Sequence, residues 1–307
     1  MALEGLHHIT AITAHARRNV DFYARALGLR LVKKTVNFDQ PTAYRLYYGD
    51  ERGTPGSLLT FFEFPGAVHG HHGDGMPYRV IWRVAGDAAL DFWSVRLDDV
   101  GVPVVRGDRD LRFADPEGLE HELVVDAVPD APLRADAPDV PAEHALLGLA
   151  GVRAYASDAR ASGPLLEALG FAPGDEEGDW ELAGEERRAR WSYDAPVARG
   201  VQGAGSIHHV AWSAADDAEL TAFRSRAMEE GARATDIIDR QYFHSVYFRE
   251  PSGVLFELAS RDIGFAYDEP EESLGQALKL PPQYESRRDQ LEQALTPLTN
   301  PRAGTAA

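Results

Sequence analysis

Two segments of this 307-residue chain carry a pair of adjacent histidines, and a third segment carries a glutamate. Residues 6–10 read Leu-His-His-Ile-Thr, and residues 207–211 read Ile-His-His-Val-Ala. Glu257 follows the second pair, behind the turn sequence Glu-Pro-Ser-Gly at 250–253. Two imidazoles and one carboxylate on separate strands form a facial ligand set for a metal ion. Such a set leaves neighbouring coordination positions open, which suits non-haem Fe(II) that handles O₂ and a substrate oxygen together.

The alternation of side chains along a strand indicates which histidine of each pair faces a cavity. Neighbouring residues point to opposite sides of a strand, so only one histidine of a pair points to a given side. His209 shares its side with the small Ala211, which leaves space for a ligand, whereas His208 shares its side with the bulky Trp212. The same comparison in the first pair favours His8. We therefore expect the second histidine of each pair to be the metal ligand.

A repeated pattern places these residues in a fold. A strand-like run, an amphipathic helix that ends at a glycine, and further strand-like runs occur in four successive copies. The glycine after each helix suits the left-handed conformation that ends helices. We predict an α+β fold of four βαβββ modules that form two barrel-like halves. The copies begin at Leu6, Tyr78, Leu147 and Ile207, and their helices end at Gly28, Gly101, Gly170 and Gly231.

The chain also shows boundaries and helix starts. The Pro- and Asp-rich stretch 127–141 predicts a linker between two halves. We expect an N-terminal pair of modules over 1–139, a C-terminal pair over 140–262, and an acidic tail over 263–307 that wraps the surface or an opening. One short helix is predicted in the tail at 285–295. Helix caps are predicted at Asp87 and at Asp216 or Asp217, and the first module's helix is predicted through 20–27.

The composition limits the classes of partner and site. The chain has no cysteine, which excludes disulfides and thiolate ligands, so any metal relies on histidines and carboxylates. A formal net charge of −18 disfavours nucleic acid as a partner. No apolar run approaches the roughly 18 residues of a membrane span, and the first residues show no signal-peptide pattern. We expect a cytoplasmic protein without a membrane partner, and a homo-oligomer is compatible with this composition.

The region around Glu257 resembles the vicinal oxygen chelate superfamily, which includes glyoxalases, bleomycin-resistance proteins and extradiol dioxygenases. The ring-cleaving motif of that superfamily runs from a histidine through a tyrosine, an acid, proline and glycine to a glutamate. Residues 246–253 and Glu257 follow it in order and spacing, but Arg240 stands where the motif has its histidine. That arginine, the similar segment 239–251, and a His-His pair in the opening strand make the chain more similar to the branch that cleaves hydroquinone-type rings. The resemblance covers residues 5–262.

The resemblance implies a ligand set and a group of assisting residues. It implies that His8, His209 and Glu257 bind Fe(II), and Mn(II) accepts the same ligand types. The resemblance further implies that five residues assist catalysis from around the metal: His208, Tyr247, Arg240, His7 and Thr10.

The expected roles follow from the chemistry of these side chains. His208 would move a proton, Tyr247 would hydrogen-bond the oxygens at the metal, and Arg240 would stabilise negative charge on the substrate. The alternation of strand sides opposes part of this assignment. His7 and His208 would have to reach the site from the opposite side of their strands, near strand ends where twist is strong.

The ligand set also predicts which modules pack together. His8 belongs to the first module, whereas His209 and Glu257 belong to the fourth. Ligands lie about 2 Å from a shared ion, so the first and fourth modules must share one cavity, and the second and third must form the other half. Glu63 and Glu122, on the final strands of the first two modules, are the alternative carboxylates if the modules pair differently.

The expected reaction is Fe(II)-dependent insertion of O₂ into a hydroquinone-type ring, with a small aromatic diol and O₂ as the reaction partners. One alternative is a catechol-type extradiol dioxygenase, whose substrate carries adjacent hydroxyls. Turnover of catechol and hydroquinone side by side separates these two. A second alternative is a non-catalytic protein of the same fold that binds a small aromatic compound or drug. Such a protein would hold no iron and would keep its ligand affinity after His209→Ala.

Overall fold

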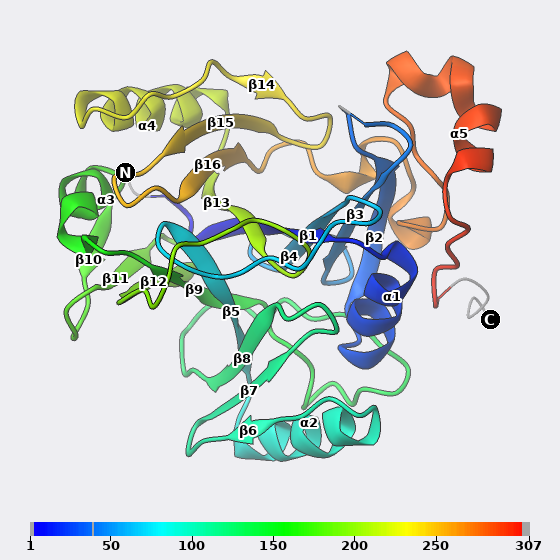
Figure 1. Cartoon of the computed structure of the whole chain (residues 1–307), viewed down its shortest axis with the longest axis horizontal. Helices are drawn as coiled ribbons and strands as arrows, with labels where there is room; N and C mark the ends of the chain where they lie inside the picture. Colours follow the sequence, from blue (N-terminus) through cyan, green and yellow to red (C-terminus); the bar gives the residue numbers. More distant parts are fainter. Residues whose placement is uncertain (1–2, 39, 303–307) are drawn as a thin grey trace.

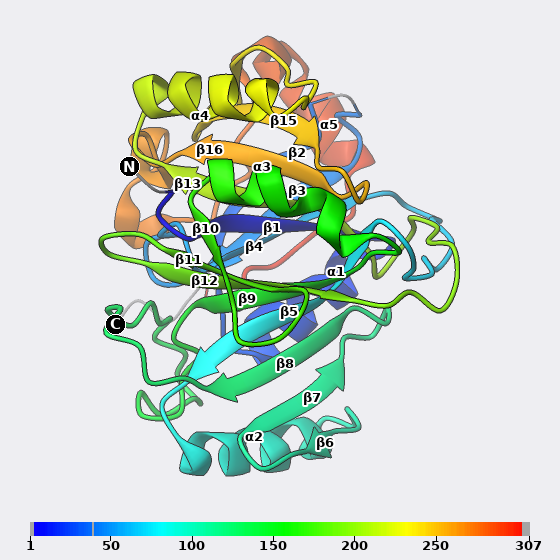
Figure 2. The ribbon, with the colours of Figure 1, turned by 90° about the vertical axis from the view of Figure 1, so that its left-hand side faces the viewer.

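The computed structural model describes residues 3–38 and 40–302, and its strands form two eight-stranded sheets. The first sheet combines strands of the first and fourth modules, and the second combines strands of the second and third modules. Figure 2 shows the first sheet above the second. The predicted α+β fold of four βαβββ modules is therefore confirmed, including the pairing of the first module with the fourth.

The first sheet is built around the antiparallel pair β1 and β13. Parallel strands flank this pair, with β4 beside β1 and β16 beside β13. In order across the sheet, its strands are β14 (Ile238–Asp239), β15 (His244–Arg249), β16 (Leu255–Ser260), β13 (Ile207–Ala214), β1 (Leu6–Thr13), β4 (Leu58–Glu63), β3 (Tyr44–Gly49) and β2 (Arg30–Val36).

The second sheet repeats this plan around the antiparallel pair β5 and β9. Again a parallel strand lies on either side, β8 beside β5 and β12 beside β9. In order, its strands are β10 (Phe171–Pro173), β11 (Asp179–Ala183), β12 (Arg188–Asp194), β9 (Leu149–Tyr155), β5 (Met76–Val84), β8 (Glu120–Val125), β7 (Asp110–Ala114) and β6 (Val105–Arg106).

Aromatic side chains fill the space where the two sheets meet. Trp191 of β12 contacts both Trp212 of β13 and Phe256 of β16, with ring centroids 5.9 and 5.0 Å apart. All three side chains are fully buried. Burial of side chains of this size stabilises a fold by about 1.5–3 kcal/mol each. These contacts join the two sheets into one core, so Trp212 and Phe256 are not available to line a ligand cavity.

Helices cover the sheets, with α4 (Asp217–Glu229) beside β15 and β16, and α2 (Asp87–Asp99) at the far end of the second sheet (Figures 1 and 2). Asp216 caps α4 as predicted, accepting hydrogen bonds from two backbone amides. The cap predicted at Asp87 is wrong, because α2 begins after Gly86 without a side-chain cap. Asp87 instead lies in the first turn of α2, where its negative charge interacts favourably with the helix dipole. No helix among the described residues is long and apolar enough to cross a membrane.

The first and third modules have shorter and less regular helices. The helix predicted through 20–27 consists of α1 (Ala16–Val20) and a π-helical segment, Asp21–Ala26. Phe22 and Tyr23 are both buried in this segment, and the wider π turn allows these neighbouring rings to pack inward together. Gly28 follows with φ of 69°, as its role as a helix stop requires. The third module has a 3₁₀ turn, Ala159–Ser162, before α3 (Gly163–Ala168).

The tail packs against β2 and β3 of the first sheet (Figure 1). The buried Lys33 donates to Asp268 at 2.6 Å and to Glu269 at 2.7 Å, which fixes the start of the tail. The helix predicted at 285–295 begins later, because a 3₁₀ turn that starts at Pro282 extends to Arg287. The tail contains 3₁₀ turns at Phe265–Tyr267, Glu271–Ser273 and Pro282–Arg287, followed by α5 (Arg288–Ala294).

Candidate metal centre and its cavity

Three neighbouring strands of the first sheet bring His8, His209 and Glu257 together (the His-His-Glu cluster). Their strands, β1, β13 and β16, are adjacent in the sheet. The Nε2 atom of His209 lies 2.9 Å from Oε2 of Glu257, and the Nε2 atom of His8 lies 3.3 Å from the same oxygen. The two Nε2 atoms are 3.4 Å apart. All three side chains are buried. Residues from opposite ends of the chain therefore direct three potential ligand atoms at one point.

The geometry of the cluster fits a divalent metal ion. Nitrogen and oxygen ligands lie about 2.1 Å from such an ion, so neighbouring ligands in an octahedral site are about 3 Å apart. The three contacts in the cluster have this size. One carboxylate oxygen of Glu257 accepts a hydrogen bond from Ser245, but Oε2 has no hydrogen-bond donor. A buried carboxylate oxygen without a donor is costly, and a bound cation would satisfy it.

The protonation states also suit a metal. Burial lowers the pKa of His209 to about 3, so its imidazole is neutral at physiological pH. Burial alone would raise the pKa of Glu257, but attraction to His8 and His209 in their protonated forms outweighs it and holds this pKa well below its usual value, so the carboxyl group does not take up a proton before the imidazoles do. The cluster is therefore an ionised carboxylate facing neutral imidazole, which is the form that metal ligands require.

His7 and His208 are the extra residues of two β-bulges in the β1–β13 pair. The register passes from Leu6 opposite Trp212 directly to His8 opposite Ala211, so His7 has no partner of its own. Across the other bulge, Thr10 lies opposite His209 and Ala11 opposite Ile207, which leaves His208 unpaired. A bulge redirects side chains and breaks strict alternation. The expectation that these histidines belong to the opposite side of their strands is therefore wrong.

Each bulge histidine contacts the cluster histidine beside it. The Nδ1 atoms of His7 and His8 are 2.9 Å apart, and those of His208 and His209 are 2.7 Å apart. A histidine that faces a metal through Nε2 carries its proton on Nδ1, so Nδ1 of each cluster histidine is assigned as the donor. His7 then holds its own proton on Nε2 and donates it to the backbone carbonyl of Ser260, 3.0 Å away. Both cluster rings are thus oriented by a hydrogen-bonded neighbour.

A cavity of about 360 Å³ opens beside the cluster. Tyr247, on β15, lies directly opposite Glu257 in the sheet, and its hydroxyl accepts a hydrogen bond from Nε of Arg240 at 3.2 Å. Burial and the charge of Glu257 raise the pKa of Tyr247, so its hydroxyl stays protonated. The cavity is lined by Asn37, Phe38, Arg45, Phe62, Phe64, His208, His209, Thr235, Ile238, Arg240, Tyr247 and Leu255.

The remaining sequence-predicted residues lie elsewhere. Thr10 is fully buried, and its hydroxyl lies 2.8 Å from the hydroxyl of Thr60, away from the cavity lining. The alternative carboxylates do not join the cluster. Glu63 accepts hydrogen bonds from the backbone amides of Ala16 and Tyr44, and Glu122 forms an ion pair with an arginine of the second sheet.

The sequence analysis missed two cavity-side residues on β3, Arg45 and Tyr47. Their side chains are both buried, and they lie two positions apart and so on one side of the strand. The guanidinium of Arg45 lies over the rings of Tyr47 and Phe62, 5.1 and 4.7 Å from their centroids. The available signal was an arginine within the otherwise apolar run 44–48, because a buried strand admits a charge only where it meets a partner or a cavity.

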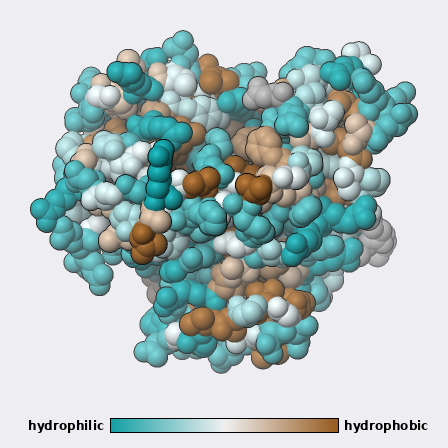
Figure 3. Space-filling view, in the orientation of Figure 1, coloured by the Kyte–Doolittle hydropathy of each residue, from teal (hydrophilic) through white to brown (hydrophobic). Residues whose placement is uncertain are grey.

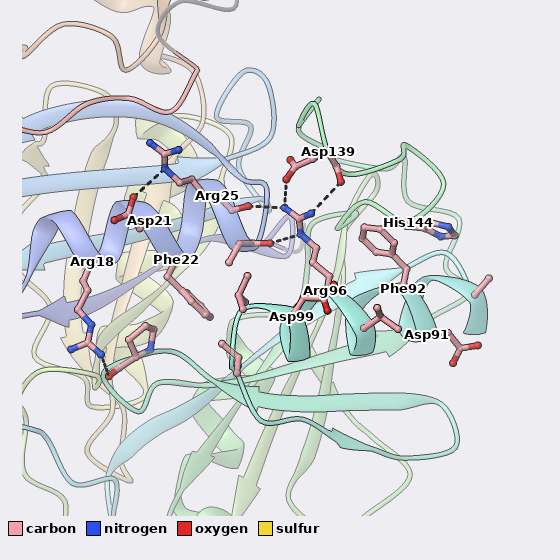
Figure 4. Close-up of a pocket in the computed structure, with 16 residues that line it drawn as sticks. Arg18, Asp21, Phe22, Arg25, Asp91, Phe92, Arg96, Asp99, Asp139 and His144 are labelled. Atoms are coloured by element: carbon pink, nitrogen blue, oxygen red, sulfur yellow. Dashed lines mark hydrogen bonds and ion pairs between the residues drawn. The ribbon is translucent and has the colours of Figure 1, made fainter.

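A larger cleft of about 1050 Å³ lies between the π-helical segment Asp21–Ala26 and α2, away from the cluster (Figure 4). Its guanidinium groups are engaged, since Arg25 pairs with Asp21 and Arg96 pairs with Asp139. Figure 3 shows hydrophobic side chains at the same end of the molecule, over α2, on an otherwise mostly hydrophilic face. Among the described residues that line this cleft, no group of ligand atoms like the His-His-Glu cluster occurs.

Comparisons with known proteins agree with the fold. The model of the Glyoxalase/Bleomycin resistance protein/Dioxygenase superfamily matches residues 5–123 and 154–258. MhqO of Bacillus subtilis, provisionally named a ring-cleaving dioxygenase, is 40% identical over 95% of this chain and 96% of its own length. The chlorohydroquinone/hydroquinone 1,2-dioxygenase of Sphingobium indicum is 33% identical over 94% of this chain and 95% of its own length.

Solved structures with a similar fold support the same family. The crystal structure of a provisionally named dioxygenase of Bacillus subtilis has a TM-score of 0.90 at 37% identity, over 97% of this chain and 98% of that one. Glyoxalase I of Zea mays has a TM-score of 0.58 at 16% identity, over 84% of this chain and 92% of that one, and shows the fold alone. The resemblance drawn from the sequence is confirmed, and the chain belongs to the glyoxalase, bleomycin-resistance protein and dioxygenase superfamily.

Proposed function

We propose that this protein is a ring-cleaving dioxygenase that inserts O₂ into a hydroquinone-type ring at an Fe(II) ion held by His8, His209 and Glu257. The observation that carries the proposal is the cluster itself, a buried facial set of two imidazoles and a carboxylate beside a small cavity. Full-length relatives named as ring-cleaving and hydroquinone dioxygenases support the reaction class. Mn(II) is the alternative ion, because it accepts the same ligands.

The bound metal would supply a Lewis acid for a phenolic oxygen and a redox centre for O₂. The chain's own residues would bind and orient the ring around it. The cavity of about 360 Å³ lies near the lower end of the size range of ligand sites, about 300–1,000 Å³, and suits a single aromatic ring. Phe38, Phe62 and Phe64 provide its apolar walls.

Polar groups at the cavity would control protons and charge. His208 accepts from His209 through Nδ1 and therefore holds its proton on Nε2, where it can donate to a substrate oxygen. Tyr247 keeps its hydroxyl proton, and the Arg240 guanidinium beside it adds a fixed positive charge. Donors that are already oriented stabilise negative charge on the reacting ring without reorganisation. We expect these three residues to act on the substrate, and His7 to act by positioning His8.

The test is metal analysis of anaerobically purified protein, followed by oxygen uptake with hydroquinone and catechol side by side. We expect iron near one per chain and faster uptake with hydroquinone. Tyr247→Phe should retain the metal and lose about tenfold or more in kcat/KM, since one oriented donor typically contributes at least that much. Bound zinc without oxygen uptake would contradict the proposal, and faster uptake with catechol would favour the extradiol alternative.

A further inference from the structure

Arg45 is a buried cation without a counter-ion at the wall of the cavity. Its side chain is 3% exposed, and neither Nε nor Nη2 has a hydrogen-bond partner. Among the described residues, no carboxylate forms an ion pair with it. The rings of Tyr47 and Phe62 hold the guanidinium in place without using its N–H groups. Leaving a buried charged donor unsatisfied is expensive, so a group of this kind is expected to meet a ligand.

The second sheet shows how this chain treats comparable arginines elsewhere. Arg79 pairs with both Glu120 and Glu122, at 2.8 and 3.2 Å. Arg153 donates two hydrogen bonds of 2.8 Å to the carboxylate of Asp194. These two arginines therefore carry their counter-ions within the protein. Arg45 differs from them, although it is more deeply buried.

The surroundings of Arg45 favour an anion in the cavity. Among the described residues, the cavity lining contains two guanidinium groups, those of Arg45 and Arg240, and no carboxylate. Glu257 lies behind this lining, and a bound divalent ion would more than offset its charge. The hydroxyl of Tyr47 is also buried without a hydrogen-bond partner, which adds a second free donor beside Arg45. This arrangement is unusual in a chain whose formal net charge is −18.

Arg45 also lies close enough to the His-His-Glu cluster for one ligand to contact both. Phe62 contacts the guanidinium of Arg45 and also the ring of His209, with the two ring centroids 6.3 Å apart. Arg45 is therefore one side chain away from the cluster. A single aromatic ring that places one oxygen at the cluster could present a second anionic oxygen to Arg45.

We propose that Arg45 is a specificity-determining residue that binds a second anionic oxygen of the substrate, separate from the oxygen that faces the metal. The anionic oxygen belongs either to a carboxylate substituent on the ring or to the ionised second hydroxyl of an acidic hydroquinone. This inference rests on the proposed function for the identity of the ring, but it concerns binding and not turnover. The planar guanidinium can bind either kind of oxygen with charge-assisted hydrogen bonds.

The test measures binding by calorimetry under anaerobic conditions, so that the ring is not turned over. The probes are methylhydroquinone, chlorohydroquinone and 2,5-dihydroxybenzoate, and the protein carries its metal. We expect at least one acidic probe to bind about tenfold or more tightly than methylhydroquinone, since charge-assisted hydrogen bonds contribute about 1.5–3 kcal/mol. Arg45→Gln should abolish this preference and leave the affinity for methylhydroquinone within about threefold of wild type. Arg79→Gln, in the second sheet, is the matched control and should retain the preference.

The outcomes separate the two sources of the anion and the two proposals. Preference for 2,5-dihydroxybenzoate alone assigns a ring carboxylate, and preference for chlorohydroquinone assigns the ionised second hydroxyl. If Arg45→Gln does not fold, Arg45→Lys is the variant to measure. Lysine keeps the positive charge but lacks the planar guanidinium, so this variant must show a smaller preference for the acidic probe than wild type. Equal binding of all three probes by wild type, or an unchanged preference in the Arg45 variants, would overturn the inference. Absence of oxygen uptake would instead count against the proposed function.

Discussion

The centres of the two sheets have the same backbone register but different side chains. Val210 lies opposite Phe256 in the first sheet, and Val80 lies opposite His121 at the corresponding place in the second. The bulges correspond as well, because the register shifts in the β5–β9 pair leave Tyr78 and Ala150 unpaired, as those in the β1–β13 pair leave His208 and His7 unpaired. The strand framework of the candidate metal site is therefore present twice.

Only one of the two frameworks carries a complete set of candidate metal ligands. At the positions that correspond to the cluster, the second sheet keeps the carboxylate but replaces both histidines. Its glutamate is bound by the arginine that stands in place of a histidine, at 3.2 Å. The corresponding pairs are His8 and Gly151, His209 and Arg79, and Glu257 and Glu122.

We interpret this difference as the reason why only the first sheet forms a candidate metal centre. In the second sheet the carboxylate is neutralised from within the protein, so no external cation is needed. In the first sheet the two buried imidazoles leave Oε2 of Glu257 without a donor. Fold and bulges alone thus do not create the site. The donor set and its missing partner do.

The largest effect that we predict from the comparison of the two sheets concerns the corresponding residues Glu257 and Glu122. Glu257→Gln removes the charged ligand, and we expect metal affinity and oxygen uptake to fall by about 100-fold or more, since even indirect supporting contacts contribute about 10–100-fold. Glu122→Gln should leave both unchanged. Metal content after dialysis, measured for both variants beside wild type, checks this. Equal metal loss in the two variants would mean that the cluster is not the binding site.

A second prediction concerns Gly151, which stands at the position of His8. A Cβ atom there would collide with the backbone carbonyl oxygen of Arg190. We expect Gly151→Ala to lower the free energy of unfolding by about 1–3 kcal/mol, the usual cost of overpacking a core. The second sheet therefore could not gain a histidine ligand here by side-chain substitution alone.

The matched control for this substitution is Gly163→Ala at the start of α3. Its Cβ would make only ordinary contacts, with the nearest atom of Trp180 at 3.5 Å, and alanine favours a helix over glycine. Urea unfolding of both variants is the measurement. If Gly151→Ala were as stable as Gly163→Ala, backbone crowding would not explain why the second sheet lacks the ligand.

Much of this comparison could be predicted from the sequence. Helical periodicity and the glycine stops identified four modules, and the requirement that His8, His209 and Glu257 meet at one ion fixed the pairing of modules. Both inferences rest on local pattern or on a strong geometric constraint. The bulges could not be predicted, because an unpaired residue in a strand depends on the register with a distant partner. This is why the side assigned to His7 and His208 was wrong.

Arg45 shows a second limit of sequence reasoning. Its strand belongs to the first module, whereas most of the cavity lining comes from the fourth. The sequence of residues 44–48 does not predict which strand will face them across the barrel. That no carboxylate of the described residues pairs with Arg45 is a property of the folded molecule, so only the structure could reveal it.

A third prediction concerns acid stability and the corresponding residues His121 and Phe256. Burial lowers the pKa of His121 from its ordinary value of 6.5 to about 3. Its Nδ1 accepts from the indole N–H of Trp82 at 3.1 Å, and its Nε2 lies 3.0 Å from the hydroxyl of Tyr23. The neutral ring is thus hydrogen-bonded on both sides, away from the His-His-Glu cluster.

Between pH 6.5 and about 3, the unfolded chain binds a proton at His121 that the folded protein does not. The contribution of His121 to the free energy of unfolding should therefore be complete above pH 6.5. It should fall as pH decreases through this range, by up to about 1.4 kcal/mol per pH unit. His121→Phe, which copies Phe256 of the first sheet, removes that proton. The variant should be less stable at pH 7, because Trp82 and Tyr23 lose a partner, but its stability should depend less steeply on pH. Urea unfolding of wild type and His121→Phe between pH 4 and 7 measures how steeply the free energy of unfolding depends on pH in each. Equal slopes would show that His121 does not contribute to the acid sensitivity of the protein.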